Sequence, residues 1–256
     1  MNIIVCVKQV IDTEAVIELD SAGDVVLEGQ TLVIDPYSEF AVERAVQLKE
    51  QLGGTVTLVC LGTQDCLSAV RHGLAMGADD AVLIEDDQWL ERDAAFVAAA
   101  LAAAVKDRGA DLIMGGWKSG DTASAQVMGR MAALLDLPLA NMATGLEVAD
   151  GTATVSCEVD DGVEVASLPL PAVVAAQQGL AEPRYPSVRD VMQARRKKSD
   201  VVPVADLAIE GDGLDALTVV ERTLKPARSG GRIIEGEWNE AVAETTRLLV
   251  EEAKVF

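Results

Sequence analysis

Apolar runs of strand length alternate with longer helical segments along residues 1–140. The runs are rich in Val, Ile and Leu and occupy 2–7, 56–61, 81–84 and 112–114. Segments rich in Ala, Leu and Glu lie between them, and we expect helices at 38–52, 66–76, 93–106 and 122–135. Such alternation is typical of βαβ units, and continuous apolar runs are typical of parallel strands covered on both faces. The pattern therefore predicts a Rossmann-like α/β fold with a doubly wound, mainly parallel sheet.

Polar turn residues interrupt this alternation at two places and predict extensions of the sheet. Apolar runs at 16–19 and 25–27 flank a turn at 20–24, which predicts a β-hairpin inserted after the first strand. A second alternating pattern surrounds Asp150-Gly151 and predicts another hairpin, followed by strands at 164–168 and 172–176. A basic helix is expected at 188–198 and a terminal helix at 238–253. The stretch between them lacks a dense apolar pattern, so we expect an arm rather than a second domain.

The charge of the chain is strongly negative and unevenly distributed. It carries 21 Lys and Arg against 42 Asp and Glu, a formal net charge of −21 at pH 7. General binding to nucleic acid or to anionic lipid is disfavoured, because both need a basic surface. Residues 184–198 nevertheless hold six cations against one acid, Asp190. A run of cations is usually a solvated helix face, but on this acidic chain it favours a docking surface for a negatively charged protein.

The sequence offers few groups for acid–base or metal chemistry. Its four cysteines form no C-x-x-C pair, and its only histidine, His72, lies in a predicted helix. A metal site built from histidines is therefore excluded, and we expect no metal. No apolar stretch approaches the ~20 residues of a membrane span, and the N-terminus lacks the pattern of a signal peptide. We expect a cytoplasmic protein with reduced thiols and no catalytic residues of its own.

A glycine-rich turn at 115–122 is the strongest candidate for ligand binding. It follows a predicted strand, opens a predicted helix and nearly matches the phosphate loop G-x-x-x-x-G-K-[ST], except that Asp121 replaces the lysine. Backbone N–H groups and hydroxyls at such a turn still suit a phosphate, although a tight turn without a ligand is an equal alternative. Ligands of open α/β sheets sit where the strand order reverses, so 8–11 and 115–121 should face one crevice, with 35–38 at its rim.

Seven segments in sequence order resemble the β subunits of electron transfer flavoproteins, and the resemblance covers nearly the whole chain. These segments are VKQVIDT (7–13), DPYSEFAVERAVQLKE (35–50), LAMGADDAVLI (74–84), DLIMGG with GDTASAQ after it (111–126), LPLPAVV (168–174), EPRYPS (182–187) and VMQARRKK (191–198). The resemblance implies a heterodimer whose α subunit makes most contacts to a redox-active FAD, while the β subunit forms one wall near Thr13. It also implies an adenine nucleotide in the β subunit, usually AMP. The chain looks more like bacterial members, some of which bind a second FAD there.

The resemblance assigns the nucleotide contacts residue by residue. The adenine would contact Cys6, Leu61 and the loop formed by Asp35, Pro36, Tyr37 and Ser38. The phosphate would lie on the turn that contains Gly116, Asp121, Thr122, Ala123, Ser124, Ala125, Gln126 and Val127. Asp35 departs from the family, in which asparagine is usual, and adds a negative charge near the nucleotide.

The resemblance also divides the chain by role. Residues 1–183 would form the nucleotide-binding domain, 184–199 a recognition loop with a basic helix, and 200–256 an arm and helix that pack on the α subunit. The recognition loop would dock on acyl-CoA dehydrogenases and similar flavoenzymes through Val188. Its flanking cations, Arg195, Arg196, Lys197 and Lys198, would steer acidic partners.

Electron transfer is the function that the resemblance implies. A partner flavin dehydrogenase would reduce the FAD, which would deliver the electrons to an oxidoreductase or respiratory chain. Two alternatives stay open. One is an electron-bifurcating complex, in which this subunit holds a second redox-active FAD and works as an enzyme. The other is a stand-alone nucleotide-binding module of the stress-sensor type, for which the arm and the basic loop would be dispensable.

Overall fold

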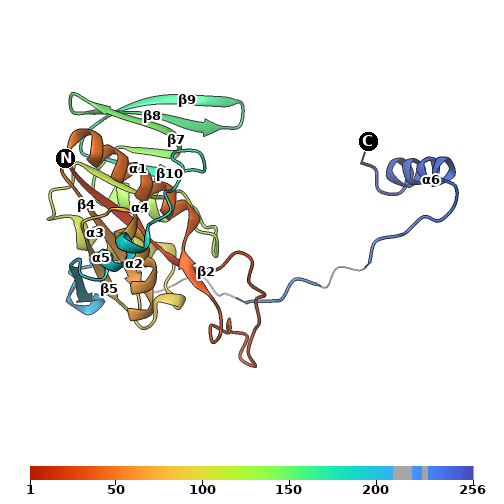
Figure 1. The fold of residues 1–256 in the computed structure, drawn as a ribbon, viewed down its shortest axis with the longest axis horizontal. Coiled ribbons are helices and arrows are strands. Elements are labelled where there is room, and N and C mark those ends of the chain that lie inside the picture. The colour runs from red at the N-terminus through yellow and green to blue at the C-terminus, as the bar shows by residue number, and fades with distance from the viewer. Residues whose placement is uncertain (210–220, 227–229, 256) are drawn as a thin grey trace.

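A nine-stranded sheet forms the centre of the protein in a computed structural model that describes residues 1–209, 221–226 and 230–255 (Figure 1). The strand order is β11-β5-β4-β1-β6-β10-β7-β8-β9. Seven strands run parallel, and they are β1 (Asn2–Val7), β4 (Thr55–Gly62), β5 (Asp80–Glu85), β6 (Leu112–Gly116), β7 (Leu139–Ala149), β10 (Ala172–Ala176) and β11 (Ser199–Pro203). β8 (Thr152–Val159) and β9 (Gly162–Pro169) add antiparallel strands at one edge. The doubly wound, mainly parallel sheet is confirmed.

Helices cover both faces of the sheet, and the alternating side chains of each strand pack against the helices on either face. From β1, Ile3 and Val5 enter one buried cluster, together with residues of α1 (Pro36–Leu52) and α2 (Leu67–Met76). Ile4 enters a second cluster on the opposite face, together with residues of α3 (Ala94–Val105) and α4 (Val127–Leu134). Both faces of the parallel strands are therefore buried, which explains their continuous apolar sequences.

The ends of α1 follow the signals in the sequence. The Asp35 carboxylate accepts hydrogen bonds from the N–H groups of Tyr37 and Ser38, and Pro36 occupies the first helical position. The helix ends at Gly53, whose φ of 74° is a conformation that favours glycine. The expected helix at 38–52 is confirmed, and the structure begins it two residues earlier.

The edge strand β11 was not expected from the sequence. Ser199–Pro203 pairs in parallel with β5, so the first residues of the predicted arm lie in the sheet. Val202, Val204, Leu207 and Ile209 then pack on the cluster that contains α3. These four residues extend the apolar cluster to which α3 contributes.

Three further predictions require correction. The helix expected at 122–135 begins only at Val127, and the basic helix expected at 188–198 is the shorter α5 (Val188–Ala194). The inserted hairpin at 16–27 is reduced to a single bridge between Leu19 and Val25, and the regular pairing joins β2 (Gln9–Ile11) to β3 (Leu32–Ile34). The hairpin around Asp150-Gly151 is confirmed by β7 and β8, with both turn residues at positive φ.

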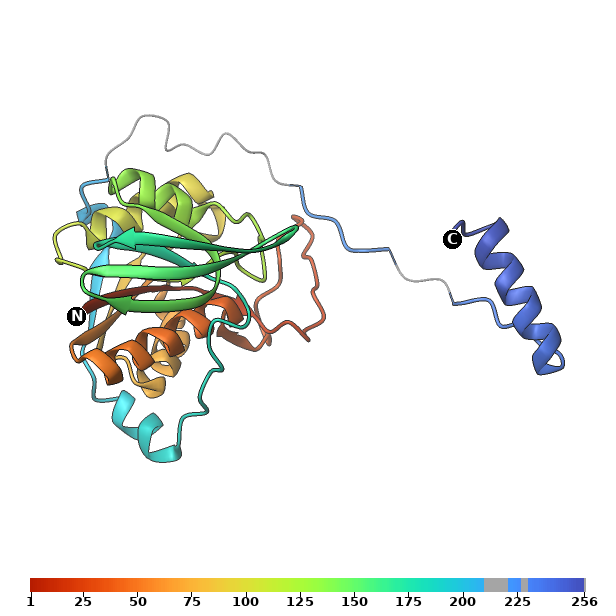
Figure 2. The same cartoon turned by 90° about the horizontal axis from the view of Figure 1, so that it is seen from above.

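The terminal helix α6 (Trp238–Glu251) stands apart from the body of the protein in both views (Figures 1 and 2). None of its residues is buried. Its sequence position agrees with the predicted helix at 238–253, while parts of the expected arm, 210–220 and 227–229, lie outside the described residues. Across the described residues, no helix combines the length and apolar character needed to cross a membrane.

Candidate functional site

The predicted crevice lies at the carboxyl ends of β1 and β6. These two strands are direct neighbours, with Cys6 opposite Gly115, and the chain order reverses on either side of β1. Parallel strands of this topology leave a ligand site outside their carboxyl ends at the reversal point. The expected meeting of the first and fourth strands is therefore present.

Asp35 links the start of α1 to the loop of residues 117–126, which we call the nucleotide loop. One carboxylate oxygen caps α1, and the other accepts a hydrogen bond from the Gly120 N–H at 2.7 Å. Burial raises the pKa of Asp35, although the N–H groups of Gly120 and Ser38 favour the carboxylate. The structure thus brings the 35–38 segment and the predicted phosphate turn into direct contact.

Lys8 supplies a cation to the nucleotide loop. Its Nζ lies 2.7 Å from the Asp121 carboxylate and 3.4 Å from the Ser119 Oγ. Burial alone would raise the pKa of Asp121, but the Lys8 ammonium lowers it overall. The local motif lacks the phosphate-loop lysine, and Lys8, directly after β1, brings a cation to the same loop from another segment. The sequence analysis placed 8–11 at this crevice but did not single out Lys8 as a site residue.

The nucleotide loop is irregular and exposed from Gly120 to Gln126. Ala123 and Ala125 adopt positive φ values of 49° and 55°, which are uncommon for residues with a side chain. Left-handed residues are one component of the backbone nests that bind anions. Since α4 begins at Val127, its N-terminal dipole acts at the end of this loop and not at Thr122, as the sequence had suggested.

Close packing requires glycine where β6 enters the loop. A Cβ added to Gly116 would lie 2.6 Å from the Cβ of Tyr37, so the start of α1 approaches this backbone too closely for any side chain. A Cβ at Gly115 would similarly lie 2.6 Å from the Met128 sulfur. The approach of Tyr37 explains the glycine at position 116, whereas the neighbour of Gly115 is the end of a flexible methionine side chain, which can shift.

Cys6 and Leu61 form part of the apolar floor of the crevice. Both are buried in the cluster shared with α3 and α4, and the Cys6 Sγ lies 3.8 Å from the Met131 sulfur. Burial raises the pKa of the Cys6 thiol to about 12, so the thiol stays neutral and does not act as a nucleophile. Their role at this position is apolar contact.

A pocket of about 370 Å³ adjoins the outer side of the nucleotide loop. Its lining residues are Thr13, Pro36, Tyr37, Phe40, Lys118, Ser119, Gly120, Ala123 and Gln178. Tyr37 makes edge contacts with Phe40 and Trp117, and the Lys118 Nζ lies 4.6 Å from the centre of the Trp117 ring. Thr13 is thereby brought next to the aromatic side chains at the start of α1.

Residues 184–198, which we call the docking segment, lie on the α1 and α2 side of the protein. Tyr185 is 99% exposed and Val188 is 81% exposed, and Arg195 and Arg196 are exposed as well. Lys197 is less available to a partner protein, because its Nζ donates hydrogen bonds to the carbonyl oxygens of Leu74 and Ala78. Lys198 pairs with Asp200 at 2.6 Å. Two of the four predicted steering cations are therefore engaged within the chain.

Comparisons with known proteins relate the whole chain to one family. Residues 23–207 match the electron transfer flavoprotein domain family. Electron transfer flavoprotein subunit beta of Bacillus subtilis is 40% identical over 258 residues, covering 100% of both chains. The corresponding subunit of Syntrophomonas wolfei is 40% identical over 238 residues, covering 93% of this chain and 91% of its own. Subunit CarD of the caffeyl-CoA reductase-Etf complex of Acetobacterium woodii is 33% identical over 242 residues, covering 92% of each. The chain therefore belongs to the electron transfer flavoprotein β-subunit family.

Proposed function

We propose that this chain pairs with an α subunit and carries electrons from an acyl-CoA-type flavin dehydrogenase, through a shared FAD, to an oxidoreductase or respiratory chain. In this role it binds AMP structurally. The observation that carries the proposal is the crevice between β1 and β6, where Asp35, Lys8 and the nucleotide loop meet. These groups suit binding of a phosphate and a nucleoside. Cys6, at the crevice floor, is buried with a raised pKa, so it suits apolar contact with a bound nucleotide and not nucleophilic attack on it.

The two sides of the nucleotide loop serve different ligands. On the side of Lys8, the loop takes the phosphate of AMP once Lys8 exchanges the Asp121 carboxylate for the phosphate. The outer pocket at Thr13, Tyr37 and Phe40 forms the β-subunit wall of the shared FAD site, since its aromatic lining suits a flat ring system. The bound FAD supplies the redox chemistry, and the residues of this chain bind and orient.

Nucleotide analysis of the purified heterodimer tests this assignment. Mass spectrometry of the extracted nucleotides should find one FAD and one AMP per heterodimer. Lys8→Met should lower AMP content and leave FAD content unchanged, whereas Lys118→Met, the matched lysine on the outer side of the loop, should leave AMP content unchanged. AMP content unaffected by Lys8→Met would contradict the placement of the phosphate.

An electron-bifurcating complex, which would work as an enzyme, is the second candidate function. The likeness to CarD supports an enzymatic complex, because that relative is a subunit of a complex named as a caffeyl-CoA reductase. In this case the crevice holds a second FAD, and the complex works as an enzyme. The same extraction separates the two candidates. Two FAD molecules and no AMP per heterodimer would overturn the AMP assignment, while one of each would overturn bifurcation.

Two exposed regions support the proposed partners. The apolar residues of α6 provide a surface for the α subunit, and Val188 with Arg195 and Arg196 provides a surface for an acidic flavin dehydrogenase. We assign the complex to the cytoplasm, because the four buried cysteines are free thiols and the cytoplasm keeps thiols reduced.

A further inference from the structure

The docking segment is poorly supported by apolar packing. α5 has only seven residues, and Ala194 is its one buried residue. A hollow of about 190 Å³, lined in part by Met76, Tyr185 and Gln193, separates the segment from the last turn of α2. A helix this short is unstable in isolation, so other contacts must hold it in place.

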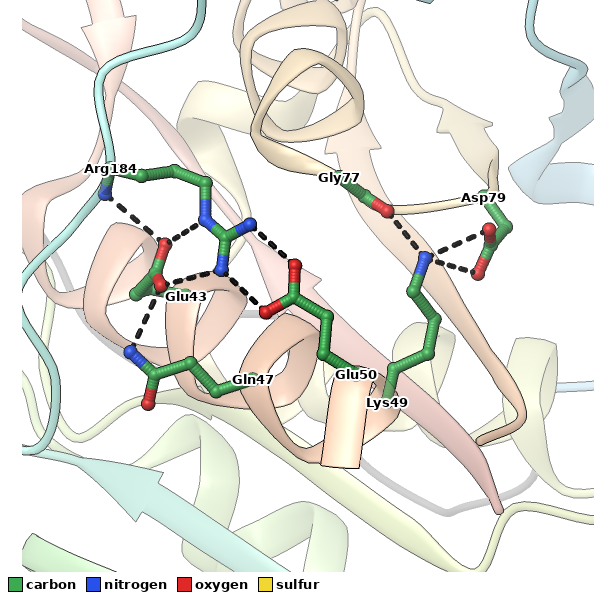
Figure 3. A network of polar contacts seen from close by, with 7 residues as sticks. All are labelled: Glu43, Gln47, Lys49, Glu50, Gly77, Asp79 and Arg184. Carbon is green, nitrogen blue, oxygen red and sulfur yellow. Dashed lines mark hydrogen bonds and ion pairs between the residues drawn. The ribbon is translucent and has the colours of Figure 1, made fainter. Parts of the chain in front are cut away.

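The first such contact is an arginine clamp at the beginning of the segment (Figure 3). The Arg184 guanidinium lies 2.8 Å from Glu43 and 2.7 Å from Glu50, two carboxylates on the same side of α1. The Arg184 backbone N–H also donates to Glu43, and Gln47 donates to the same carboxylate. The Glu43 side chain is 3% exposed and the Arg184 side chain 36%, so this hydrogen-bonded charge pair has one buried and one partly exposed member. Such pairs fix geometry more than they add stability.

The second contact lies at the end of the segment. The Lys197 Nζ donates to the Leu74 carbonyl oxygen at 2.9 Å and to the Ala78 carbonyl oxygen, which lie at the C-terminus of α2. This turn is itself fixed to α1, because Lys49 binds the Gly77 carbonyl oxygen and the Asp79 carboxylate (Figure 3). Both ends of the docking segment are thus tied to one frame made of α1 and the turn after α2.

The residues that project from this frame form a defined surface. Tyr185, Val188 and Met192 are exposed apolar side chains on and before α5, and Arg189 and Arg195 add exposed cations. Because these apolar residues face outward, they cannot hold the segment against the body. Polar contacts at the two ends hold the segment against the body and leave the apolar side chains available to a partner.

We infer that Arg184 and Lys197 are positioning residues that hold the docking segment in its binding conformation before the partner arrives. The inference rests on the proposed function. The partner that fits is a flavoenzyme with an apolar hollow for Val188 and an acidic rim for the surrounding arginines. A segment ordered in advance loses less conformational entropy on association, so loss of either tie should weaken docking without altering electron transfer in the formed complex.

Hydrogen–deuterium exchange of the purified heterodimer tests the ordering. In Arg184→Lys, which keeps the charge but loses the forked hydrogen bonds, peptides covering 185–196 should exchange about tenfold faster. Lys197→Met should produce a similar increase and provides a second variant if Arg184→Lys fails to fold. The matched control is Arg247→Lys on α6, where an arginine also pairs with two glutamates, and it should not change exchange at 185–196. Exchange that is unchanged in both tie variants would overturn the inference.

Steady-state kinetics with an acyl-CoA dehydrogenase and its acyl-CoA substrate test whether loss of either tie weakens docking. Arg184→Lys and Lys197→Met should raise the KM for the heterodimer about tenfold and leave the maximal rate and the nucleotide content unchanged. Val188→Ala should raise the KM without faster exchange. If Val188→Ala raises the KM but Arg184→Lys and Lys197→Met do not, the docking surface stands and the positioning role is overturned. An unchanged KM in Val188→Ala would overturn the docking role of the segment itself.

Discussion

Helices α1 and α6 are both amphipathic and have opposite surroundings. Seven residues of α1 are buried, whereas none of the 14 residues of α6 is buried. α6 stands apart from the body of the protein (Figure 2). In α6, Trp238 is 73% exposed, Val242 50% and Leu249 38%, although their spacing puts them on one side of the helix. Periodicity therefore determines that both segments are helical, but it does not determine what covers them.

The two helices also differ in how their ends are stabilised. α1 has the Asp35 cap and a glycine at its C-terminus, while α6 has no side-chain cap at its first turn. On α6, Arg247 pairs with Glu244 and Glu251, and exposed pairs of this kind contribute little to stability. α6 therefore depends on another surface, which the proposed function identifies as the α subunit.

Removal of α6 is the strongest test of this difference. Deletion of residues 236–256 should weaken association with the α subunit by about a hundredfold or more, because several exposed apolar side chains lose their site of burial. Thermal unfolding of the remaining chain should be unchanged. Size-exclusion chromatography and calorimetric titration with the α subunit measure both effects. Association at wild-type affinity would show that α6 is not the surface that binds the α subunit, whereas a full-length chain that does not associate with the α subunit would support the stand-alone module.

A pair of leucine variants sharpens the comparison at single-residue level. Leu58 is fully buried in β4, so Leu58→Ala should lower the free energy of unfolding by about 2–5 kcal/mol. Leu249→Ala on α6 should change the unfolding free energy of the isolated chain by less than about 0.5 kcal/mol. It should instead weaken heterodimer formation. Urea unfolding and titration give the two quantities, and equal destabilisation by both variants would contradict the assignment of α6 to a partner surface.

The last prediction concerns the Glu43 carboxylate on the polar side of α1, and how its contribution to the free energy of unfolding depends on pH. Burial alone would raise the pKa of Glu43, but hydrogen bonds and charge from Arg184 lower it overall. Glu43 therefore stabilises the fold above its unfolded pKa of about 4.3, and this contribution is lost as pH falls through the lower folded pKa. Glu43→Gln should cost about 1.5–3 kcal/mol near pH 7.

Urea unfolding of the wild type and of Glu43→Gln between pH 7 and 3 measures this contribution, and the difference between the two proteins should shrink as the pH falls. Glu244→Gln on α6 is the control, since it removes a glutamate from an exposed pair and should leave the unfolding of the body unaltered at every pH. A constant difference for Glu43→Gln across this range would show that the carboxylate charge is not what holds Arg184.

Much of the fold follows from local sequence signals. The strands at 2–7 and 172–176, the Asp35 cap with Pro36, and the turn at Asp150-Gly151 all lie where the sequence predicts them. β11 was missed because its five residues gain strand structure only by pairing with β5, which lies more than 100 residues earlier in the chain. The late start of α4 was missed because the left-handed conformations of Ala123 and Ala125 are not encoded by residue type.

The amino-acid sequence by itself determined the alternation of strands and helices, the glycine-rich turn and the basic character of residues 184–198. Those features depend on spacing and residue type over short distances. Only the tertiary structure decided which charges meet: Lys8 contacts Asp121 across 113 residues, and Arg184 contacts Glu43 across 141. It also turned Lys197 inward and left α6 uncovered. Ion pairs between distant segments have no periodic signature, because any cation of an acidic chain has many possible partners until the sheet brings one pair together.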